Sequence, residues 1–388
     1  MATALVNLLL AHNVYSAPIP PHNMTSFLQN VSDGCNDLRN CRTMWGIVYS
    51  CLLTVFACIW TAVHPNLPKH YRGDGFLSIT SRVGLMIVSL LSPEGFLALA
   101  WRQFLWSWRI SEKYKMVEGW ALTHSYFVTM GGFFDPSKGG AVDPNDLQRY
   151  PSIIEKTGNT RKATITKMEI LDRSKGDAFS KFLIVLQLLW FITQYVGRWA
   201  RHLHRSQLEA MTLAYAALSL FVYVLWWHKP VNIRFPIHVT EESPSVPPTS
   251  ETNVDQPIPK TETDADPMSL VEVSEPELRE SLFIFAAAGM IFGGIHCLAW
   301  SFPFPTHKEM ILWRVAAIYI TVAPIVIMLG NLVAGHVLAT SGVVIVLILP
   351  VYVAARVILL VLTFSSLRSP PPDLYQTPSW SSFLPHFG

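Results

Sequence analysis

The amino-acid sequence predicts an all-α, polytopic membrane protein, a bundle of about seven transmembrane helices. Residues 44–63 carry no charged side chain, and twenty residues are enough for an α-helix to cross the roughly 30 Å hydrocarbon core of a bilayer. Only 14% of the 388 residues are charged and 51% are hydrophobic, whereas soluble domains have roughly 25% charged residues. Lipid supplies no hydrogen-bond partners, so we expect such apolar runs to be helices. The runs lie at 44–63, 82–101, 182–198, 209–227, 281–303, 313–334 and 343–363.

The segment before the first run has the features of a lumenal or extracellular N-terminus. Asn23 and Asn30 begin two N-x-S/T glycosylation sequons, and Cys35 and Cys41 follow within the same polar stretch. Glycosylation and disulfide formation both occur in lumenal and extracellular compartments. We therefore expect glycosylation at both asparagines and regard Cys35–Cys41 as a candidate disulfide.

The second apolar run is interrupted at its middle by Pro93 and Glu94. Proline removes one hydrogen bond of a helix, so the run is either a broken span or a re-entrant hairpin. A broken span gives seven crossings, a cytosolic C-terminus and a lumenal loop 102–181. A re-entrant hairpin instead places this loop in the cytosol.

Two polar regions separate the apolar runs. Loop 102–181 is rich in Lys and Arg, and we expect amphipathic helices near 111–130 and 161–180. Residues 231–280 are dominated by Pro, Ser, Thr, Glu and Asp, the composition of a solvated linker. The predicted organisation is a lumenal segment at 1–43 with a candidate signal peptide at 1–17, a first transmembrane group at 44–230, an acidic disordered linker at 231–280, a second transmembrane group at 281–364 and a tail at 365–388.

Glu94 is the first candidate catalytic residue. An acid near the middle of a membrane costs several kcal/mol unless it is paired, hydrated or protonated, so it is a functional hypothesis by default. Kept neutral in an apolar pocket, it is a competent proton donor. The alternative is a structural acid that bonds to backbone N–H groups beside Pro93 or to an arginine.

Arg356 and His296 are further polar side chains on apolar helices. Arg356 is a candidate counter-ion for Glu94 or a binder of an anionic group, and snorkelling or helix pairing is the structural alternative. A lone histidine of this kind more often joins helices by a hydrogen bond than takes part in catalysis.

The stretch around His124 combines a histidine with aromatic residues. On a helix, Trp120, His124 and Phe127 would share one face, at spacings of four and three residues. Such a face suits an interfacial helix with its aromatic residues at headgroup level, and it also suits the wall of a pocket for an isoprenoid or acyl chain.

Metal and cofactor chemistry find little support in the sequence. Glu169, Asp172 and Asp177 are acids of the kind that hold Mg²⁺ against a diphosphate, but interspersed Lys and Arg favour a solvated, ion-paired helix face. The chain has no phosphate loop, no GxSxG elbow and no HExxH motif. We expect no metal site and no cofactor, and a net charge of +2 gives no argument for nucleic acid.

Several stretches resemble a large and mostly uncharacterised family of fungal polytopic membrane proteins. The resemblance runs from about Cys35 to Gly388 and leaves out the acidic linker. It implies a fungal source and an endomembrane location such as the endoplasmic reticulum. The stretches that carry it are RTMWGIVYSCLLTVFACIWTAVHPNLP, THSYFVTMGGF, EILDRSKGDAFSKFLIVLQLLWFITQYVGRW, LEAMTLAYAALSLFVYVLWWHKPVNIRFP and the tail SLRSPPPDLYQTPSWSSFLPHF.

By analogy of class, fungal membrane proteins of this size include metal-independent cyclases of terpenoid and meroterpenoid biosynthesis. Such a cyclase implies Glu94 as proton donor, with His124 or Arg356 to orient it, and a lipophilic prenylated substrate drawn from the membrane lipid. The alternative is a non-enzymatic transporter, channel or receptor-like protein. The candidate pocket walls are Trp120, Phe127, Trp190, Trp226, Trp227 and His296.

Overall fold

The computed structural model describes the greater part of the chain, and the described part is mostly helical. The candidate signal peptide, Asn23, Asn30 and the Cys35–Cys41 pair lie outside the described residues. The described residues are 42–64, 66–67, 75–174, 178–231, 233, 235–242, 275–333, 338–368 and 370–375.

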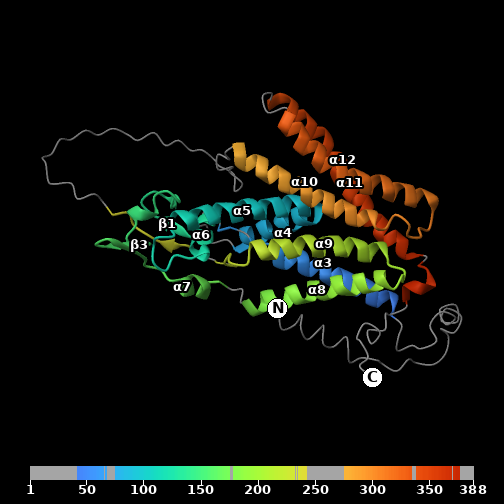
Figure 1. The fold of residues 1–388 in the computed structure, drawn as a ribbon, viewed down its shortest axis with the longest axis horizontal. Helices are drawn as coiled ribbons and strands as arrows, with labels where there is room; N and C mark the ends of the chain where they lie inside the picture. The colour runs from blue at the N-terminus through green and yellow to red at the C-terminus, as the bar shows by residue number, and fades with distance from the viewer. Residues whose placement is uncertain are drawn as a thin grey trace, which may run out of the picture. The chain divides into compact units, whose positions relative to one another are not determined.

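Five helices of the described chain are long and apolar enough to cross a membrane. A bent pair of helices makes a sixth candidate if it forms one span, and α3 (Met44–Ala62) is a shorter apolar helix. The described residues thus hold five or six candidate spans, and the expected count of about seven is not confirmed. The five are α8 (Ala178–Ala200), α9 (Gln207–Leu225), α10 (Glu275–Cys297), α11 (His307–Val333) and α12 (Leu338–Ser365) (Figure 1).

The bent pair consists of α4 (Gly75–Leu91) and α5 (Pro93–Lys113), and the helix direction bends by 114° at the break between them. Pro93 lies at the start of α5, where its missing N–H would have no partner within the helix. The break therefore lies beside the proline, as expected, and its geometry fits a broken span or a re-entrant loop.

The chain divides into two compact units. Unit 1 takes its residues from 1–60, 177–220 and 286–388, and unit 2 from 61–176 and 221–285. In unit 1, α9 contacts α10 through Tyr215 and Phe292, whose ring centroids are 5.2 Å apart. The hydroxyl of Tyr319 on α11 donates to the carbonyl oxygen of Ile348 on α12 at 3.2 Å. Two short 3-10 helices follow α12, at Ser366–Arg368 and Pro372–Tyr375.

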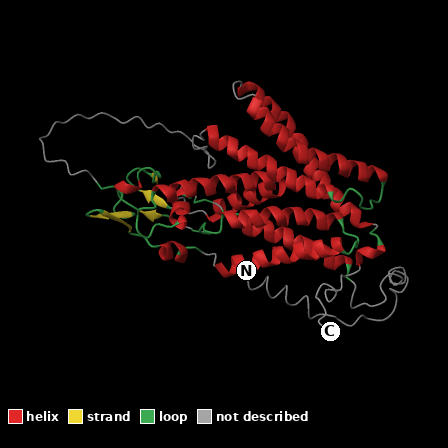
Figure 2. Cartoon of the chain, in the orientation of Figure 1, coloured by secondary structure: helices red, strands yellow, loops and turns green. Residues whose placement is uncertain are grey.

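Unit 2 contains a small polar region with strands, so the all-α expectation is wrong there (Figure 2). Strands β1 (Phe133–Asp135), β2 (Gly140–Ala141) and β5 (Ile237–His238) form a sheet in the order β2-β1-β5, with β1 antiparallel to β2 and parallel to β5. Strands β3 (Ile154–Thr157) and β4 (Thr160–Ala163) form a separate hairpin. Its two-residue loop begins at Gly158, whose φ of +59° suits a tight hairpin turn.

The two amphipathic helices expected in this loop are also corrected. The first is divided, because α5 ends at Lys113 and α6 covers only Leu122–Thr129. The second is replaced by β4 and the short helix α7 (Lys167–Asp172), since the hairpin turn at Gly158 sets strand pairing over 154–163. A 3-10 helix covers Leu147–Arg149.

Both ends of the segment 231–280, expected to be a linker, contain regular structure. Ile233 and Val239 are buried in the core of the polar region, and β5 pairs with β1. These apolar residues at the start of the segment have a core to bury them, and α10 already begins at Glu275. Residues 243–274 lie outside the described residues.

Asp135 fixes the turn that follows β1. Its carboxylate, fully buried, accepts hydrogen bonds from the hydroxyl of Ser137 at 2.6 Å and from the hydroxyl of Tyr150 at 2.9 Å. These hydrogen bonds, Ser137 first, hold the pKa of Asp135 below its usual value.

A substitution at Gly132 tests how tightly the polar region of unit 2 is packed. A Cβ atom at this position would lie 2.6 Å from ring atoms of Phe127, which is itself packed edge-on against Phe133. We expect Gly132→Ala to destabilise the protein by about 1–3 kcal/mol, the usual cost of overpacking. The measurement is the midpoint of thermal unfolding in detergent. Gly140→Ala is the matched control, because its Cβ would meet no atom closer than 4.0 Å, and equal midpoints for the two variants would contradict the assigned packing.

Candidate functional site

Glu94 lies in the first turn of α5, directly after the break from α4. The residue is 0% exposed, and its Oε1 accepts a hydrogen bond from the hydroxyl of Ser92 at 2.8 Å. A helix N-terminus carries partial positive charge, so it is a favourable place for a carboxylate. The position thus combines the burial expected of a functional acid with the surroundings of a structural one.

Aromatic side chains of unit 2 lie beside this turn. Phe96 packs edge-on against Trp226, with ring centroids 5.3 Å apart. The ring of Phe285 lies 3.8 Å from the position that a Cβ on Gly95 would take. Trp226 is 2% exposed, and its indole N–H has no hydrogen-bond partner among the described residues. Of the expected wall residues, Trp226 is the one that the structure places next to the α5 turn.

Lys229 is the residue that the sequence analysis missed. It is 1% exposed, and its ammonium group lies 4.4 Å from the centre of the Trp226 ring. The ammonium donates to the carbonyl oxygen of His64 at 2.7 Å, to Oδ1 of Asn66 at 3.1 Å and to Oε1 of Gln103 at 2.8 Å. An ammonium has three N–H donors, and three oxygens receive them.

The contacts of Lys229 join three parts of unit 2: residues 64 and 66, helix α5 and the turn after α9. We call this arrangement the Lys229 clamp. On α5, Phe96, Ala100 and Gln103 recur at helical spacing and face residues 226–229. A lysine between histidine and proline, two residues after a tryptophan pair at the end of an apolar run, was the only signal in the sequence.

His124 is held by the backbone on both sides of its ring. The Ala121 N–H donates to Nδ1 at 3.0 Å, so Nε2 carries the proton and donates to the carbonyl oxygen of Ile165 at 2.9 Å. Burial lowers the pKa of His124 below its ordinary value. The imidazole is therefore neutral at pH 7; its Nδ1 caps α6 at Ala121, and its Nε2 attaches α6 to Ile165.

The expected helix face of Trp120, His124 and Phe127 is not formed, because α6 begins only at Leu122. Trp120 precedes the helix, where its ring stacks on His124 at 5.1 Å and its N–H donates to the Ser125 hydroxyl at 3.0 Å. Phe127 is 0% exposed within the core of the polar region. Trp120 and Phe127 thus stabilise this region.

In unit 1 the structure brings Arg356 and His296 together around Phe292. The Arg356 guanidinium lies 3.9 Å from the centre of the Phe292 ring, and its Nη2 donates to the Tyr352 hydroxyl at 2.6 Å. The His296 ring lies 4.6 Å from Phe292, and its Nδ1 is 2.8 Å from the Phe292 carbonyl oxygen. Arg356 and His296 are both almost fully buried.

Two expected wall residues lie on the surface. Trp190 on α8 is 51% exposed and Trp227 is 40% exposed. Exposed tryptophans on apolar helices suit contact with lipid or with the interface region.

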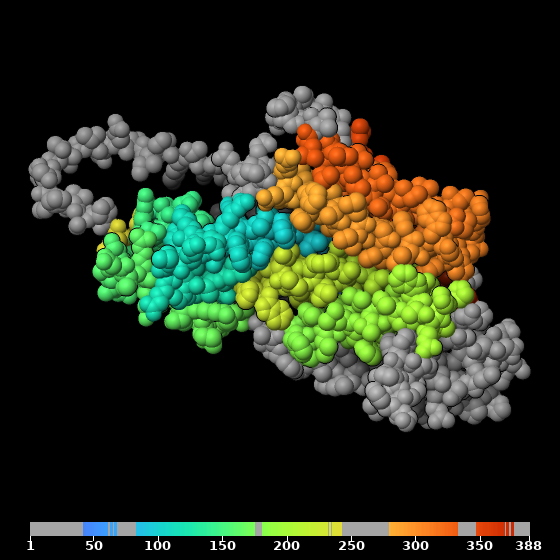
Figure 3. Space-filling model, in the orientation of Figure 1, coloured from blue at the N-terminus to red at the C-terminus, as the bar shows by residue number. Residues whose placement is uncertain are grey.

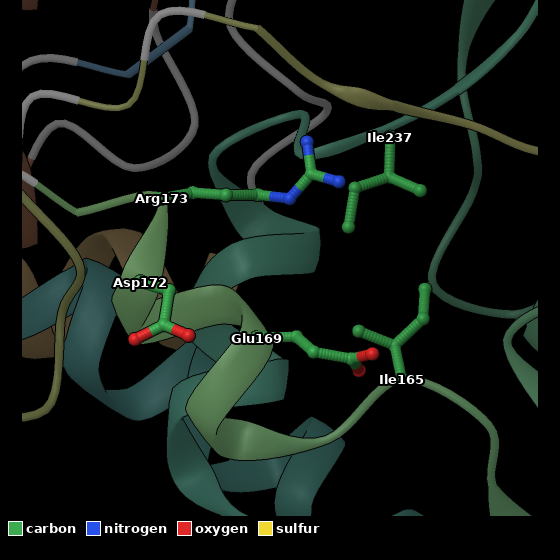
Figure 4. Close-up of a pocket in the computed structure, with 5 residues that line it drawn as sticks. All are labelled: Ile165, Glu169, Asp172, Arg173 and Ile237. Atoms are coloured by element: carbon green, nitrogen blue, oxygen red, sulfur yellow. The ribbon is translucent and has the colours of Figure 1, made fainter.

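The candidate magnesium residues do not converge. A hollow of about 370 Å³ lies beside α7, but Figure 4 shows the carboxylates of Glu169 and Asp172 pointing in different directions. Glu169 caps its own helix, since its Oε2 accepts from the Thr166 N–H at 2.6 Å. The part of the chain that the structure describes holds no cluster of three metal-ligating residues, and Asp177 lies outside it. Ile165, Arg173 and Ile237 complete the lining.

Fold and site define a mostly helical protein with several helices compatible with membrane insertion and a small α+β polar region. The profile of one protein family matches residues 25–246 and 334–387, and the chain belongs to this family, DUF8562, a family of unknown function. Comparison with curated proteins and with solved structures found no match.

The Lys229 clamp gives a prediction for stability. In Lys229→Met the buried carbonyl oxygen of His64 loses its donor, as do the side-chain oxygens of the half-buried Gln103 and the exposed Asn66. An unsatisfied buried acceptor costs about 1–3 kcal/mol, so we expect a loss of this size and a lower midpoint of thermal unfolding in detergent. The exposed Lys115 provides the control variant Lys115→Met, and a Lys229 variant as stable as this control would show that the clamp contributes nothing.

His124 gives a prediction for pH. Its folded pKa lies below the ordinary 6.5, so below pH 6.5 the unfolded chain binds more protons than the folded one. Stability should therefore fall as the pH drops through this range, by at most about 1.4 kcal/mol per pH unit. Gln in place of His124 stays neutral, so we expect a smaller fall between pH 7.5 and 5.0 in His124→Gln, measured by thermal unfolding. An identical fall in both proteins would rule out this role of His124.

Proposed function

We propose that this protein is a membrane-embedded enzyme that acts on a lipid-soluble substrate, with the carboxyl group of Glu94 as its proton-transfer group. The reaction we propose is proton-initiated cyclisation of a prenylated substrate, as in metal-independent terpenoid or meroterpenoid cyclases. The observation that carries the proposal is the complete burial of Glu94 at the break between two apolar helices. Buried acids in such segments are costly, and function is the usual reason that they persist.

The proposed reaction balances as an isomerisation. The Glu94 carboxylic acid gives its proton to an epoxide oxygen or an alkene carbon of the substrate. For an epoxide, the C–O bond breaks while an alkene π bond forms the new C–C bond, and the positive charge moves along the chain. Loss of a proton from the last carbocation to the carboxylate ends the reaction and restores the acid.

The contacts of Glu94 and His124 guide which residues we propose to assist Glu94. Ser92 donates directly to Glu94, so we assign the orienting role to Ser92. Both ring nitrogens of His124 are bonded to backbone groups, so we do not assign this role to His124. Arg356 stays a second residue proposed to orient Glu94. For the wall that shelters the carbocation we propose Phe96, Trp226 and Phe285, since aromatic faces stabilise cations.

A second candidate function rests on Arg356. A buried arginine in a candidate span, in contact with Phe292 and Tyr352, also suits a ligand or ion site of a transporter, channel or receptor-like protein. Uptake or ion flux in proteoliposomes that is lost in Arg356→Gln and kept in Glu94→Gln would favour this candidate over the enzyme.

For the location we propose the endoplasmic reticulum membrane with a lumenal N-terminus. The long apolar helices and the sequons at Asn23 and Asn30 support this placement. Glycosidase-sensitive mass that disappears when both asparagines are replaced is the expected result, and an unglycosylated native protein would contradict it.

The enzyme proposal is tested with membranes from a heterologous host that expresses the protein, supplied with prenylated epoxides and polyenes. We expect a cyclised isomer of the substrate, detected by mass spectrometry and retention time, and a loss of at least about 100-fold in Glu94→Gln, the range of general acid catalysis. Glu112→Gln is the matched control, because Glu112 is an exposed carboxylate on the same helix.

Thermal unfolding of Glu94→Gln is the second measurement, and it distinguishes a loss of activity from a loss of the fold. Glu94→Gln keeps an oxygen that accepts from Ser92, so its thermal unfolding midpoint should stay close to that of the native protein. Full activity of a folded Glu94→Gln variant would end the proposal. A variant that loses its fold instead would assign Glu94 a structural role.

A further inference from the structure

The turn between α8 and α9 in unit 1 carries an arginine enclosed by aromatic rings. The guanidinium of Arg205 lies 5.6 Å from the centre of the Tyr195 ring and 5.7 Å from that of the Trp199 ring, both on α8. It lies 5.3 Å from the centre of the Phe302 ring, in the loop between α10 and α11. Figure 3 shows α8 and α9, in light green, and α10 and α11, in orange, on the face in view. Attraction between the cation and the three rings holds the guanidinium in place.

The outer nitrogen atoms of this guanidinium can be reached from the surface. Arg205 is half-buried, and its Nε is buried without a hydrogen-bond partner among the described residues. Its Nη1 and Nη2 form no hydrogen bond with the described residues either, but these two atoms are not buried. A guanidinium presents parallel N–H donors that fit two oxygens of one phosphate. Arg205 thus offers a fixed pair of donors to an anion that approaches from outside.

The turn lies at the level where a membrane surface is expected. The candidate span on α8 ends at Ala200 and that on α9 begins at Gln207, so the turn lies between two span ends. The loop after α10 is attached to it, because the Gln207 side chain donates to the carbonyl oxygen of Pro303 at 2.8 Å. Trp199 and Trp300 are exposed on these two segments, and tryptophans are enriched at the headgroup level of a bilayer.

Basic side chains outnumber acidic ones at this end of unit 1. Two of its acids are engaged within the protein, since Glu209 pairs with Arg42 and Glu309 accepts from the hydroxyl of Ser365. Asp373, in the segment after α12, is the third acid among the described residues of this end. Lys and Arg side chains close to a membrane surface attract anionic headgroups. Those at the ends of these spans are Arg201, Arg205, Lys308, Arg314 and Arg368.

We propose that the α8–α9 turn binds the headgroup of an anionic phospholipid. Two phosphate oxygens accept from Nη1 and Nη2 of Arg205, and the acyl chains lie against the exposed Val196 and Trp199, which are three residues apart on one face of α8. The surrounding positive charge favours a headgroup with net negative charge over phosphatidylcholine. A free phosphate ion offers the same oxygens, but the exposed apolar side chains next to the turn favour a lipid. The site is independent of Glu94 and of the proposed reaction.

The test uses the full-length protein in phosphatidylcholine nanodiscs that contain a photoactivatable phosphatidic acid in both leaflets, followed by mapping of the labelled peptides. We expect labelling around the α8–α9 turn that unlabelled phosphatidic acid suppresses. Labelling should fall roughly ten-fold in Arg205→Gln, the effect of hydrogen bonds to a charged group. It should fall by a smaller factor in Arg205→Lys, which keeps the charge but not the pair of parallel donors. Arg161→Gln, at an exposed arginine of β4 in unit 2, should leave labelling unchanged.

Four results would overturn the proposal. Equal labelling of the same peptides by a photoactivatable phosphatidylcholine would show bulk lipid only. Suppression by inorganic phosphate as strong as that by the unlabelled lipid would identify a free anion as the ligand. An equal fall in Arg161→Gln would show that the total charge sets the binding, and native labelling of Arg205→Lys would show that the donor pair is not used. Unfolding midpoints identify the variants that fold, and Glu94→Gln should bind the probe as the native protein does.

Discussion

Hydrocarbon offers no hydrogen-bond partner, and this constraint governs every polar group in the candidate spans. Several threonines meet it locally, because a hydroxyl donates to the carbonyl oxygen four residues earlier in the same helix. Such side chains need no partner from another element and indicate no function. Polar side chains that bond to another element, or that keep an atom without a hydrogen-bond partner, are the ones that can indicate a function. The local bonds are Thr54 to Ser50, Thr212 to Leu208, Thr321 to Ala317 and Thr363 to Leu359.

The same constraint explains the buried charged side chains, which join separate segments of the chain by hydrogen bonds and ion pairs. In unit 1 the buried Glu209 caps α9 by accepting from the Ser206 N–H at 2.8 Å, and it forms a two-point ion pair with Arg42. Arg42 and Arg198 also donate to the carbonyl oxygen of Leu374. These bonds attach the segment after α12 to the end of α8 and, through the Arg42–Glu209 ion pair, to the start of α9. In unit 2 the Lys229 clamp likewise joins separate segments of the chain by hydrogen bonds. Buried charge by itself therefore does not identify a catalytic group here, and what distinguishes Glu94 is its place at a helix break beside aromatic rings.

The sequence predicted those elements that depend on one local property. Apolar runs of sufficient length became α8 to α12, and Pro93 marked the break between α4 and α5. The sequence did not predict the elements that form by pairing between distant segments. An example is β5, which pairs with β1 about a hundred residues earlier in the chain. The residues of the candidate site divide in the same way, into those that a local sequence pattern predicts and those that it does not. Burial of Glu94 and Arg356 could be expected from their apolar surroundings, whereas the Lys229 clamp depends on oxygens at positions 64, 66 and 103 that no local pattern connects.

The family match covers part of each candidate site. The match covers residues 25–246 and 334–387, so Glu94, Trp226 and the whole Lys229 clamp lie within it. Arg356 and Tyr352 also lie within it, whereas Phe285 beside the α5 turn and Phe292 and His296 around Arg356 lie between the matched segments. Each of the two candidate sites thus combines residues inside and outside the matched segments. The extent of the match therefore does not choose between them, and chemistry separates the two proposals: Glu94 is an acid bonded to Ser92, whereas Arg356 is a cation over the ring of Phe292.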